Sequence, residues 1–391
     1  MSPVTIEFHG SPEPTLGVEW ELQLVDTETR ELRPVASELL AELAAPHGGE
    51  HPKLKNELLD NTVEVITGIC PDVPGVRADL EASVAELTAA ARRRGLALAC
   101  AGSHPTTDWA TQQVSPSDRY RQLMVDLQWL ARRMQIFGVH VHVGVRSADR
   151  VVPIVNHLAT WVPHLLALSA SSPYWVGKDT GLASVRSQIF GMLPTAGLPL
   201  PLDDWAGFEE LLDSLIATGT VASIKEVWWD VRPHPDFGTV EIRACDGLST
   251  LDEVCAVAAL CQCLVVTADR VLEDGGTLAT LPPWVLRENK WRAARYGLDA
   301  ELITAPGGTT ARVGERLLTA VEELKPVAVE LGCADDLARL GAIVRTGGSY
   351  ARQRAVAEAA GGDLTAVVDH LVAEFAAGSP LRRRERAGST G

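Results

Sequence analysis

The chain has 391 residues, of which 46% are apolar and 22% are charged, a composition typical of globular proteins. Its formal net charge is −16, from 51 acidic and 35 basic residues. Such an acidic surface repels the phosphate backbone, which argues against nucleic acid as a partner. An anionic ligand would therefore have to meet local arginines or a bound metal ion.

Nothing in the sequence predicts secretion or a membrane span. The first ten residues, MSPVTIEFHG, lack the basic and apolar regions of a signal peptide. The apolar stretch 151–168 is interrupted by prolines and histidines, and the run 254–266 is too short to cross a bilayer. Seven cysteines at irregular spacing form no C-x-x-C pair, which favours free thiols in a reducing compartment. We expect a soluble, cytoplasmic protein.

Strands and helices are irregularly interleaved along the chain. Apolar and polar residues alternate with strand periodicity at four clear places and two weaker ones. The clear strands are 16–25, 62–67, 138–145 and 239–244, and the weaker ones are 96–101 and 227–231. Helical spacing predicts a helix over 78–94 and, after a capping box at Ser249 and Thr250, another helix through Val266.

The strands are too widely spaced for repeated βαβ units, so we predict an α+β fold. In this fold, a mostly antiparallel sheet has helices on one face and an open active-site face on the other. A helical section follows over 310–380, with glycine breaks at 347–348 and 361–362. We expect a single catalytic domain over 1–380 and a disordered, arginine-rich tail over 381–391.

Charged residues gather on one face of the four clear strands. Because successive side chains of a strand point to opposite faces, residues two apart share a face. The apolar residues of each strand, many of them β-branched, point the other way. The polar residues on the shared face are Glu19 and Glu21 in the first strand, Glu64 in the second, His140 and His142 in the third, and Glu241 and Arg243 in the fourth.

Two interpretations of this face are open. An ordinary antiparallel sheet turns a polar face to water, and each strand by itself fits that description. Together, however, the four faces hold no lysine and concentrate carboxylates, whose mutual repulsion is costly unless a cation neutralises it. Carboxylate oxygens with one imidazole are ligands suited to Mg²⁺ or Mn²⁺. The sequence therefore favours a metal site on this face.

Several basic residues could contact an anionic substrate. Arg243 is the clearest, because it shares the acidic face. For the others a structural role is equally open: Arg232 could pair with Asp230 or Asp236, and Arg292 with the glutamate four residues before it. The remaining candidates are Arg186, Asn289, Lys290 and Arg295. The chain has neither a P-loop nor a G-x-G-x-x-G motif, so the nucleotide-binding folds that carry them are unsupported.

A set of longer motifs occurs in a fixed order along residues 15–300. They are TLGVEWELQLVD, TVEVITGIC, RYRQLM, FGVHVHVGV, LSASSPYWVGKDTGLASVRSQIF, WWDVRPHPDFGTVEIRACD and NKWRAARYGLDA. This combination resembles the glutamate–cysteine ligase type 2 family, the bacterial carboxylate–amine ligases.

The resemblance implies a glutamine-synthetase-like fold, in which the sheet forms a funnel for ATP, Mg²⁺ and an amino acid. It implies ATP-dependent amide bond formation between L-glutamate and L-cysteine. By position, it makes Arg243 a phosphate contact and Arg186 a contact to the substrate carboxylate. Of the other candidate anion contacts, we expect Asn289 and Arg292 to bind the nucleotide. The metal-binding positions that the resemblance implies are Glu19, Glu21, Glu64, His140 and Glu241.

The expected mechanism has two steps. The γ-phosphoryl group of ATP moves to the substrate carboxylate, and an amine then attacks the acyl phosphate. The expected partners are small molecules (an amino acid, an amine and ATP), with Mg²⁺ or Mn²⁺ as the cofactor, and a homodimer is a further candidate. The alternatives are a metal-dependent hydrolase, a ligase for a different amine, and a non-catalytic ligand-binding protein. A requirement for ATP would distinguish a ligase from the metal-dependent hydrolase, because a hydrolase acts without ATP.

Overall fold

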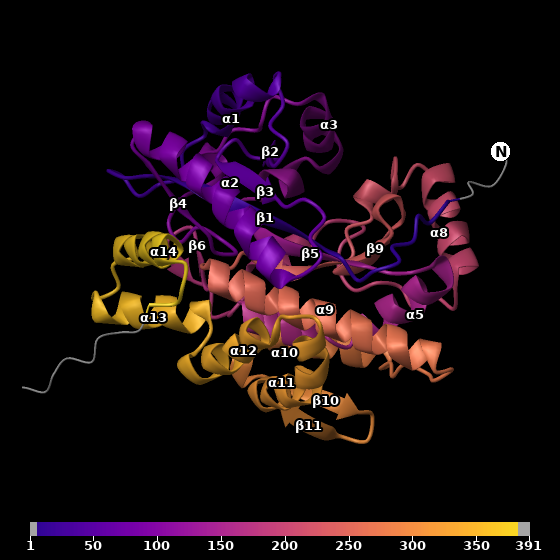
Figure 1. Ribbon diagram of the computed structural model, residues 1–391. Coiled ribbons are helices and arrows are strands. Elements are labelled where there is room, and N and C mark those ends of the chain that lie inside the picture. Colours follow the sequence, from indigo (N-terminus) through magenta and orange to yellow (C-terminus); the bar gives the residue numbers. More distant parts are fainter. Residues whose placement is uncertain (1–5, 382–391) are drawn as a thin grey trace, which may run out of the picture.

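The computed structural model describes residues 6–381, and residues 1–5 and 382–391 lie outside the described part. All but the first residue of the predicted tail, 381–391, therefore fall outside it. Figure 1 shows the sheet running through the middle of the described chain. The long helix α9 (Leu251–Glu273) lies beneath the sheet, with the helices of residues 313–346 beyond it and those of residues 349–377 to one side.

Residues 6–381 form a main sheet of seven strands in which every pairing is antiparallel. The strands are β1 (Leu16–Asp26), β2 (Leu54–Asn56), β3 (Thr62–Ile66), β4 (Leu96–Ala99), β5 (Gly138–Gly144), β8 (Val231–His234) and β9 (Thr239–Asp246). Their order is β2-β3-β1-β5-β9-β8, and β4 pairs with the end of β1. The antiparallel sheet that the alternation predicted is confirmed.

The four clear predicted strands are β1, β3, β5 and β9, and the weaker one at 96–101 is β4. The strand predicted over 227–231 is wrong, because β8 begins only at Val231 and continues to His234. Its limits are set by pairing with β9, from Val231 opposite Ile242 to His234 opposite Thr239. The short strand β2, which pairs with β3, was not predicted.

The apolar face of the sheet is deeply buried. Five alternate residues of β1 are each at most 1% exposed, and burial of such a side chain stabilises the fold by roughly 1.5–3 kcal/mol. They are Leu16, Val18, Trp20, Leu22 and Leu24. The Trp20 indole N–H also donates to the main-chain oxygen of Leu248 at 3.1 Å, so this tryptophan belongs to the core.

Helices cover this apolar face. The helices other than α9 are α1 (Ala36–Ala44), α2 (Val73–Arg93), α3 (Asp118–Leu127), α4 (Trp129–Arg132), α5 (Ala148–Leu158), α6 (Val162–Ser169), α7 (Arg186–Phe190), α8 (Trp205–Ala217), α10 (Pro283–Tyr296), α11 (Val313–Glu330), α12 (Ala334–Thr346), α13 (Ser349–Ala359) and α14 (Thr365–Ala377). Helix α2 packs against β1, β3 and β4, and α9 packs against β1 and β5. Helices α2 and α9 thus lie on the apolar face, and the charged residues lie on the other face of the sheet.

Helix α9 begins at the predicted capping box. The Thr250 hydroxyl accepts a hydrogen bond from the Glu253 N–H and donates one to the Glu253 carboxylate. The helix runs to Glu273, beyond the predicted Val266, and by length and composition it could cross a membrane. However, 83% of its apolar window is buried inside the protein, as in the core helix of a folded domain.

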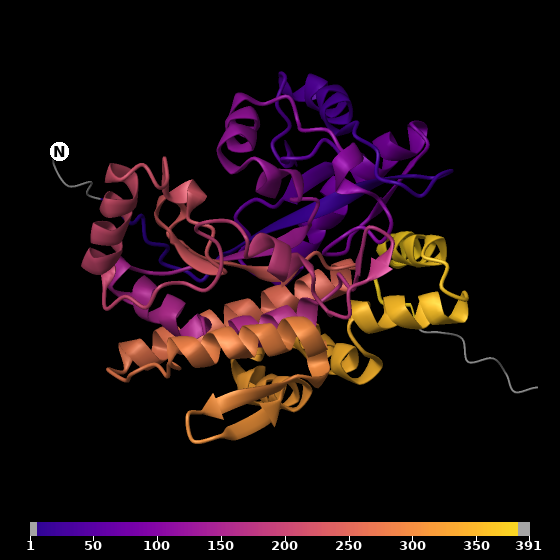
Figure 2. The same cartoon turned by 180° about the vertical axis from the view of Figure 1, so that it is seen from behind.

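The C-terminal section is helical from Val313, slightly later than predicted. Residues before it form the hairpin of β10 (Glu301–Ala305) and β11 (Thr309–Arg312), visible at the lower edge of the helical layer in Figure 2. A second small hairpin joins β6 (Tyr174–Trp175) to β7 (Lys178–Asp179). The glycine breaks separate α12, α13 and α14 as expected. The single catalytic domain over 1–380 stays a prediction.

All seven cysteines lie within the described residues, and all are free and buried. The Sγ atoms of Cys263 and Cys333 are 3.8 Å apart, well beyond the roughly 2.05 Å of a disulfide bond. The prediction of free thiols is confirmed.

Candidate active site

Strand register brings the predicted acidic face together. On one side of β1, Glu21 lies opposite Glu64 of β3. On its other side, Glu19 lies opposite His140 of β5. Residues directly opposite each other in neighbouring strands have Cβ atoms about 5 Å apart, so these side chains meet across the sheet.

Strand β9 extends this row of polar side chains. Glu241 lies opposite His142 of β5 on one side and opposite Arg232 of β8 on the other. The pairing of β5 with β9 shifts register beside His140, which marks a β-bulge. At this bulge Arg243 donates a hydrogen bond to Glu241, and its Nη1 lies 3.4 Å from Nδ1 of His140.

Two groups of these side chains are spaced to hold a metal ion. Ligand atoms of Glu19, His140 and Glu241 lie within 4.8 Å of one another, and so do those of Glu21, Glu64 and His140. Within the groups, Nδ1 of His140 is 2.7 Å from Oε2 of Glu19, and its Nε2 is 3.9 Å from Oε1 of Glu21. These five residues are called the carboxylate cluster below. The structure therefore brings all five predicted metal-site residues together.

The carboxylate cluster is largely shielded from water. His140 is 5% exposed and Glu241 is 1% exposed, while the Glu19 side chain keeps 25% of its surface accessible. An ordinary solvated sheet face does not bury its charged side chains in this way. That alternative interpretation of the strand pattern is therefore wrong.

Burial and repulsion disfavour the negatively charged forms of Glu21 and Glu64. Burial raises the pKa of Glu21 to about 8, with a further contribution from the nearby Glu57 carboxylate. Burial also raises the pKa of Glu64 well above its usual range, and repulsion from the Glu19 carboxylate adds to it. With a pKa of about 8, Glu21 retains a proton near neutral pH unless a cation replaces it.

Glu241 and Glu19 are instead stabilised in their charged forms, and His140 in its neutral form. Burial alone would raise the pKa of Glu241, but the guanidinium groups of Arg243 and Arg232 outweigh it and hold this pKa below its usual range. Burial would also raise the pKa of Glu19, but hydrogen bonds from His140 and His142 outweigh burial and hold this pKa below its usual range. Burial, reinforced by Arg243, lowers the pKa of His140 to about 4. The imidazole is then neutral at pH 7, the form that binds metals.

The donor set of the cluster suits a hard divalent cation. Four carboxylates and one imidazole match the preferences of Mg²⁺ and Mn²⁺ rather than those of a soft, thiolate-binding metal. A divalent cation would also remove the repulsion that raises the pKa values of Glu21 and Glu64. The residues therefore fit the metal that the family resemblance implies.

Arg232 supports Glu241 and makes neither of the ion pairs that the sequence left open. Its Nε donates to Oε2 of Glu241 at 2.7 Å, and its Nη1 donates to two main-chain oxygens of the segment before β8. Among residues 6–381, neither Asp230 nor Asp236 forms an ion pair with it. Asp230 instead accepts from Nζ of Lys290 at 2.6 Å.

Two buried arginines keep unpaired donors near the cluster. Arg186, the first residue of α7, is 3% exposed, and its Nε has no hydrogen-bond partner among the described residues. The same holds for Nε of Arg243. The Arg186 guanidinium lies against Gly138, where any Cβ would collide with it. Unpaired buried donors are costly, so both arginines are candidates for contact with an anionic ligand.

Asn289 and Arg292 are not part of the cluster. Both lie on α10, where the Asn289 amide accepts from and donates to the main chain of Ile303 at 2.8 and 2.9 Å. Arg292 forms the helix ion pair with Glu288 at 2.7 Å and donates to the main-chain oxygen of Glu301. The prediction that these two residues contact the nucleotide has no support in the structure, because their polar groups bind the protein itself.

The sequence interpretation missed Glu57. This residue follows β2, and its carboxylate lies close enough to raise the pKa of both Glu21 and Glu64. Burial raises its own pKa too. It escaped detection because it lies outside any strand with visible alternation.

Three aromatic rings line the end of the cluster near β8 and β9. The His234 and Phe237 rings are stacked, with centroids 4.1 Å apart and planes at 7°. His142 packs edge-on against both rings, and its Nε2 lies 3.2 Å from Glu19. Phe237 is 62% exposed, so one hydrophobic ring is accessible beside the charged site. His142, His234 and Phe237 are called the aromatic shelf below.

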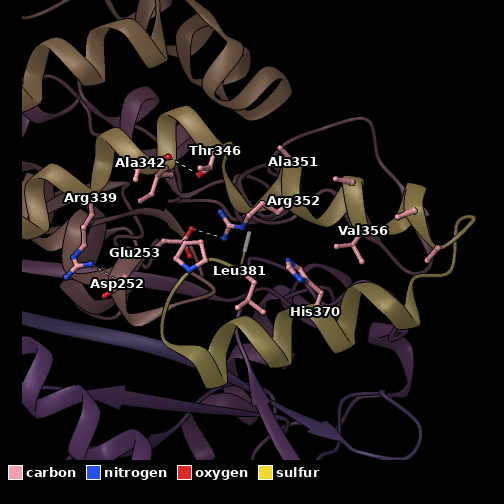
Figure 3. A pocket seen from close by; sticks show the side chains of 15 residues that line it. Asp252, Glu253, Arg339, Ala342, Thr346, Ala351, Arg352, Val356, His370 and Leu381 are labelled. Atoms are coloured by element: carbon pink, nitrogen blue, oxygen red, sulfur yellow. Dashed lines mark hydrogen bonds and ion pairs between the residues drawn. The ribbon is translucent and has the colours of Figure 1, made fainter. Parts of the chain in front are cut away.

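A separate cavity of about 890 Å³ lies among the start of α9 and helices α12, α13 and α14. Figure 3 shows Arg352 pointing towards Glu253 in this cavity, with His370 and Leu381 nearby. Arg352 binds Glu253 at 2.8 Å and Glu374 at 2.7 Å, so these charges satisfy one another. The carboxylate cluster does not line this cavity, which therefore is not the candidate active site.

Comparison with known sequences identifies close relatives along the whole chain. Residues 15–370 match the model of glutamate–cysteine ligase family 2. A protein of Frankia casuarinae, provisionally named glutamate–cysteine ligase 2-1, is 55% identical over 377 residues, covering 96% of this chain and 99% of that protein. A Thermobifida fusca protein, provisionally named glutamate–cysteine ligase 2, is 54% identical over 96% of this chain and 94% of that protein.

Two solved structures share the fold at low sequence identity. The glutamate–cysteine ligase of Francisella tularensis, in complex with AMP, aligns with a TM-score of 0.66 and 12% identity over 95% of this chain and 90% of that one. A bifunctional glutathione synthetase from Pasteurella multocida aligns with a TM-score of 0.63 and 15% identity over 93% of this chain and 52% of that one. The ligase-type α+β fold expected from the motifs is confirmed, and the chain belongs to glutamate–cysteine ligase family 2.

Proposed function

We propose that this protein is an ATP-dependent ligase that activates L-glutamate and joins it to an amine, with L-cysteine as the first acceptor to test. The observation that carries the proposal is the shielded carboxylate cluster beside two arginines whose Nε donors are unpaired. A site of this kind acts by positioning and electrostatics, and phosphoryl transfer requires little else from the protein. Membership of the ligase family supports the same reaction.

The cluster would hold Mg²⁺ or Mn²⁺, which when bound neutralises the charge of the ATP phosphates. The unpaired Nε of Arg243 then serves the phosphoryl group during its transfer. Arg186 binds one carboxylate of the amino acid, which leaves the second carboxylate to attack the γ-phosphorus and expel ADP. The acyl phosphate so formed is attacked by the amine, and the amide and inorganic phosphate result.

The two ends of β5 suggest how the substrates are arranged. Arg186 lies at the Gly138 end, whereas the aromatic shelf contains His142 and extends towards the hairpin of β8 and β9. An exposed aromatic ring can stack on a nucleobase. The structure of the Francisella ligase contains AMP, which supports nucleotide binding by this fold. We place the nucleobase on Phe237 and the amino acid at Arg186.

We expect ADP release only when ATP, Mg²⁺ or Mn²⁺, L-glutamate and an amine are present together. The assay uses L-glutamate with L-cysteine and a panel of other amines, and it omits each component in turn. Cleavage of an amide without ATP would identify a metal-dependent hydrolase instead. Nucleotide or metal binding without any turnover would identify a non-catalytic binding protein. The cytoplasmic location and a homodimer stay predictions.

We expect Phe237→Ala to raise the KM for ATP by about tenfold, since stacking on an aromatic side chain contributes about 1–3 kcal/mol per base. The KM for L-glutamate should change by less than about twofold. Trp284→Ala is the matched control, because Trp284 is another half-exposed aromatic residue but lies on α10. An unchanged KM for ATP in the Phe237 variant would show that the nucleobase does not stack on Phe237.

A further inference from the structure

Asp246 is a completely buried carboxylate at the end of β9, with no role in the mechanism above. Its Oδ2 accepts hydrogen bonds from the Ser171 N–H at 3.0 Å and from the Ser172 hydroxyl at 2.6 Å. Its Oδ1 accepts one from the Ser184 hydroxyl at 2.8 Å. The carboxylate therefore joins two separate segments, one on each side of β6 and β7, to the end of the strand that carries Glu241.

The hydroxyls of Ser172 and Ser184 also accept hydrogen bonds from the first turn of α7. The Arg186 N–H donates to Oγ of Ser172 at 3.1 Å, and the Ser187 N–H donates to Oγ of Ser184 at 3.2 Å. Because each hydroxyl gives its proton to Asp246, its lone pairs are directed at the first turn of α7. The main-chain position of Arg186 is thereby fixed through a carboxylate that does not touch its side chain.

Asp246 and Arg186 also interact electrostatically. Burial raises the pKa of Asp246, and the Arg186 guanidinium opposes this rise, as do the hydrogen bonds from the serines. Among residues 6–381 Arg186 has no carboxylate within ion-pair distance, and its Nε is unpaired. A buried cation that lacks an ion pair keeps capacity for an incoming anion, provided that a nearby charge stabilises it.

The surrounding chain is shaped to hold this carboxylate. A Cβ on Gly102 would come within 2.6 Å of the Asp246 carboxyl group, so only glycine leaves room. The Gly102 N–H donates to the Ser171 hydroxyl at 2.8 Å, and Gln353 of α13 donates to the Ser171 main-chain oxygen at 2.7 Å. Several parts of the fold therefore converge on this buried carboxylate, and the three hydrogen bonds that it accepts offset the cost of burying it.

We propose that Asp246 is a positioning residue for Arg186, and that through Ser172 and Ser184 it sets the affinity of the site for the carboxylate of the amino-acid substrate. This inference rests on the proposed function, in which Arg186 binds that carboxylate. It assigns Asp246 no contact with substrate or with the reacting atoms.

A merely structural aspartate would make a different prediction. Its loss would destabilise the fold and lower the yield of active protein, but the molecules that remained folded would bind L-glutamate normally. Asp269 is a matched control of this kind, because it is a buried aspartate of α9 that binds Arg150 at 2.8 Å, away from the site.

The test measures L-glutamate binding by calorimetry, with Mg²⁺ present and ATP absent, on folded protein of each variant. We expect Asp246→Ala to weaken binding by about tenfold or more, in line with the loss of hydrogen bonds to a charged group. Asp269→Ala, the same change at the control position, should leave binding within about twofold of the parent protein. If Asp246→Ala does not fold, Ser172→Ala removes one link of the chain while leaving the carboxylate in place, and it should weaken binding in the same direction.

A double-mutant cycle with Arg186→Ala decides the route of the effect. If Asp246 acts through Arg186, the double variant binds L-glutamate no more weakly than Arg186→Ala alone. Losses that multiply in the double variant would overturn the inference, and so would normal binding by Asp246→Ala or a parent protein that binds no L-glutamate. A parent that binds L-glutamate but releases no ADP with any amine would instead refute the proposed function and leave this test intact.

Discussion

Replacing Glu64 by glutamine is expected to abolish metal-dependent ADP release and, at the same time, to stabilise the metal-free protein. Burial and the neighbouring carboxylates raise the pKa of Glu64 well above its usual range, so its charge is unfavourable when no cation is present. Among residues 6–381 no lysine, arginine or histidine lies within ion-pair distance of it. Glutamine removes the charge but also deletes a ligand, so stabilisation by added Mg²⁺ should shrink.

Glu241→Gln is expected to behave in the opposite way in the metal-free protein. Glu241 is 1% exposed and pairs with both Arg232 and Arg243, which are themselves largely buried. Removing one partner of a buried ion pair typically costs about 3–5 kcal/mol, because it leaves an uncompensated buried charge. From the strand pattern alone, both variants would be expected to relieve repulsion equally. The observed ion pairs contradict this expectation for Glu241, and for Glu64 it stays a prediction.

Thermal melts with and without Mg²⁺, run beside the ADP assay, separate these outcomes. Neither variant should turn over, but the metal-free melting temperature should rise for Glu64→Gln and fall by several degrees for Glu241→Gln. Retained turnover in both variants, with an unchanged Mg²⁺-induced shift, would show that the carboxylate cluster does not carry the reaction. If the two metal-free variants melted at the same temperature, Glu64 and Glu241 would not differ in their electrostatic surroundings as the structure indicates.

The stability of the metal-free protein is expected to fall as the pH rises from about 7 to about 8, and Mg²⁺ should restore it at the upper end. The pKa of Glu21 is raised from 4.5 to about 8 in the folded protein, and that of Glu64 is also raised. At a pH between 4.5 and about 8, Glu21 of the folded protein therefore holds a proton that the unfolded chain has already released. Stability from these groups is therefore complete below pH 4.5 and is lost as the pH approaches 8.

Melting temperatures across this range, with EDTA and with excess Mg²⁺, provide the measurement. Histidines whose pKa values are lowered by burial to about 4, such as His140 and His164, add stability as the pH rises towards 6.5, so the decline is measured above pH 7. Carboxylates whose pKa values are lowered, such as Asp179, have added their stabilisation by about pH 5. Glu21→Gln combined with Glu64→Gln is the control, because it should flatten the metal-free decline. A metal-free protein that is equally stable at about pH 7 and about pH 8 would mean that these carboxylates are not held in a repelling cluster.

The alternation of residues along the strands determined which side chains share a face. The two-residue period of a β-strand is local, so Glu19 and Glu21 point the same way whatever strands lie beside them. The same reasoning predicted that His140 and Glu241 would join them, and the structure confirms both. The free cysteines and the cap of α9 at Thr250 also followed from local composition and spacing.

Only the tertiary structure decided which of these faces meet and how charge is distributed over them. Strand order placed Glu64 among carboxylates and Glu241 between two arginines, and no local pattern contains that information. Asp246 was missed for the same reason, because its partners are distant in sequence and come together only when the chain folds. Glu57 lies outside any strand with visible alternation, and its proximity to Glu21 likewise arises only on folding. Hydrogen bonds and pKa values depend on neighbours in space, whereas periodicity depends on neighbours along the chain.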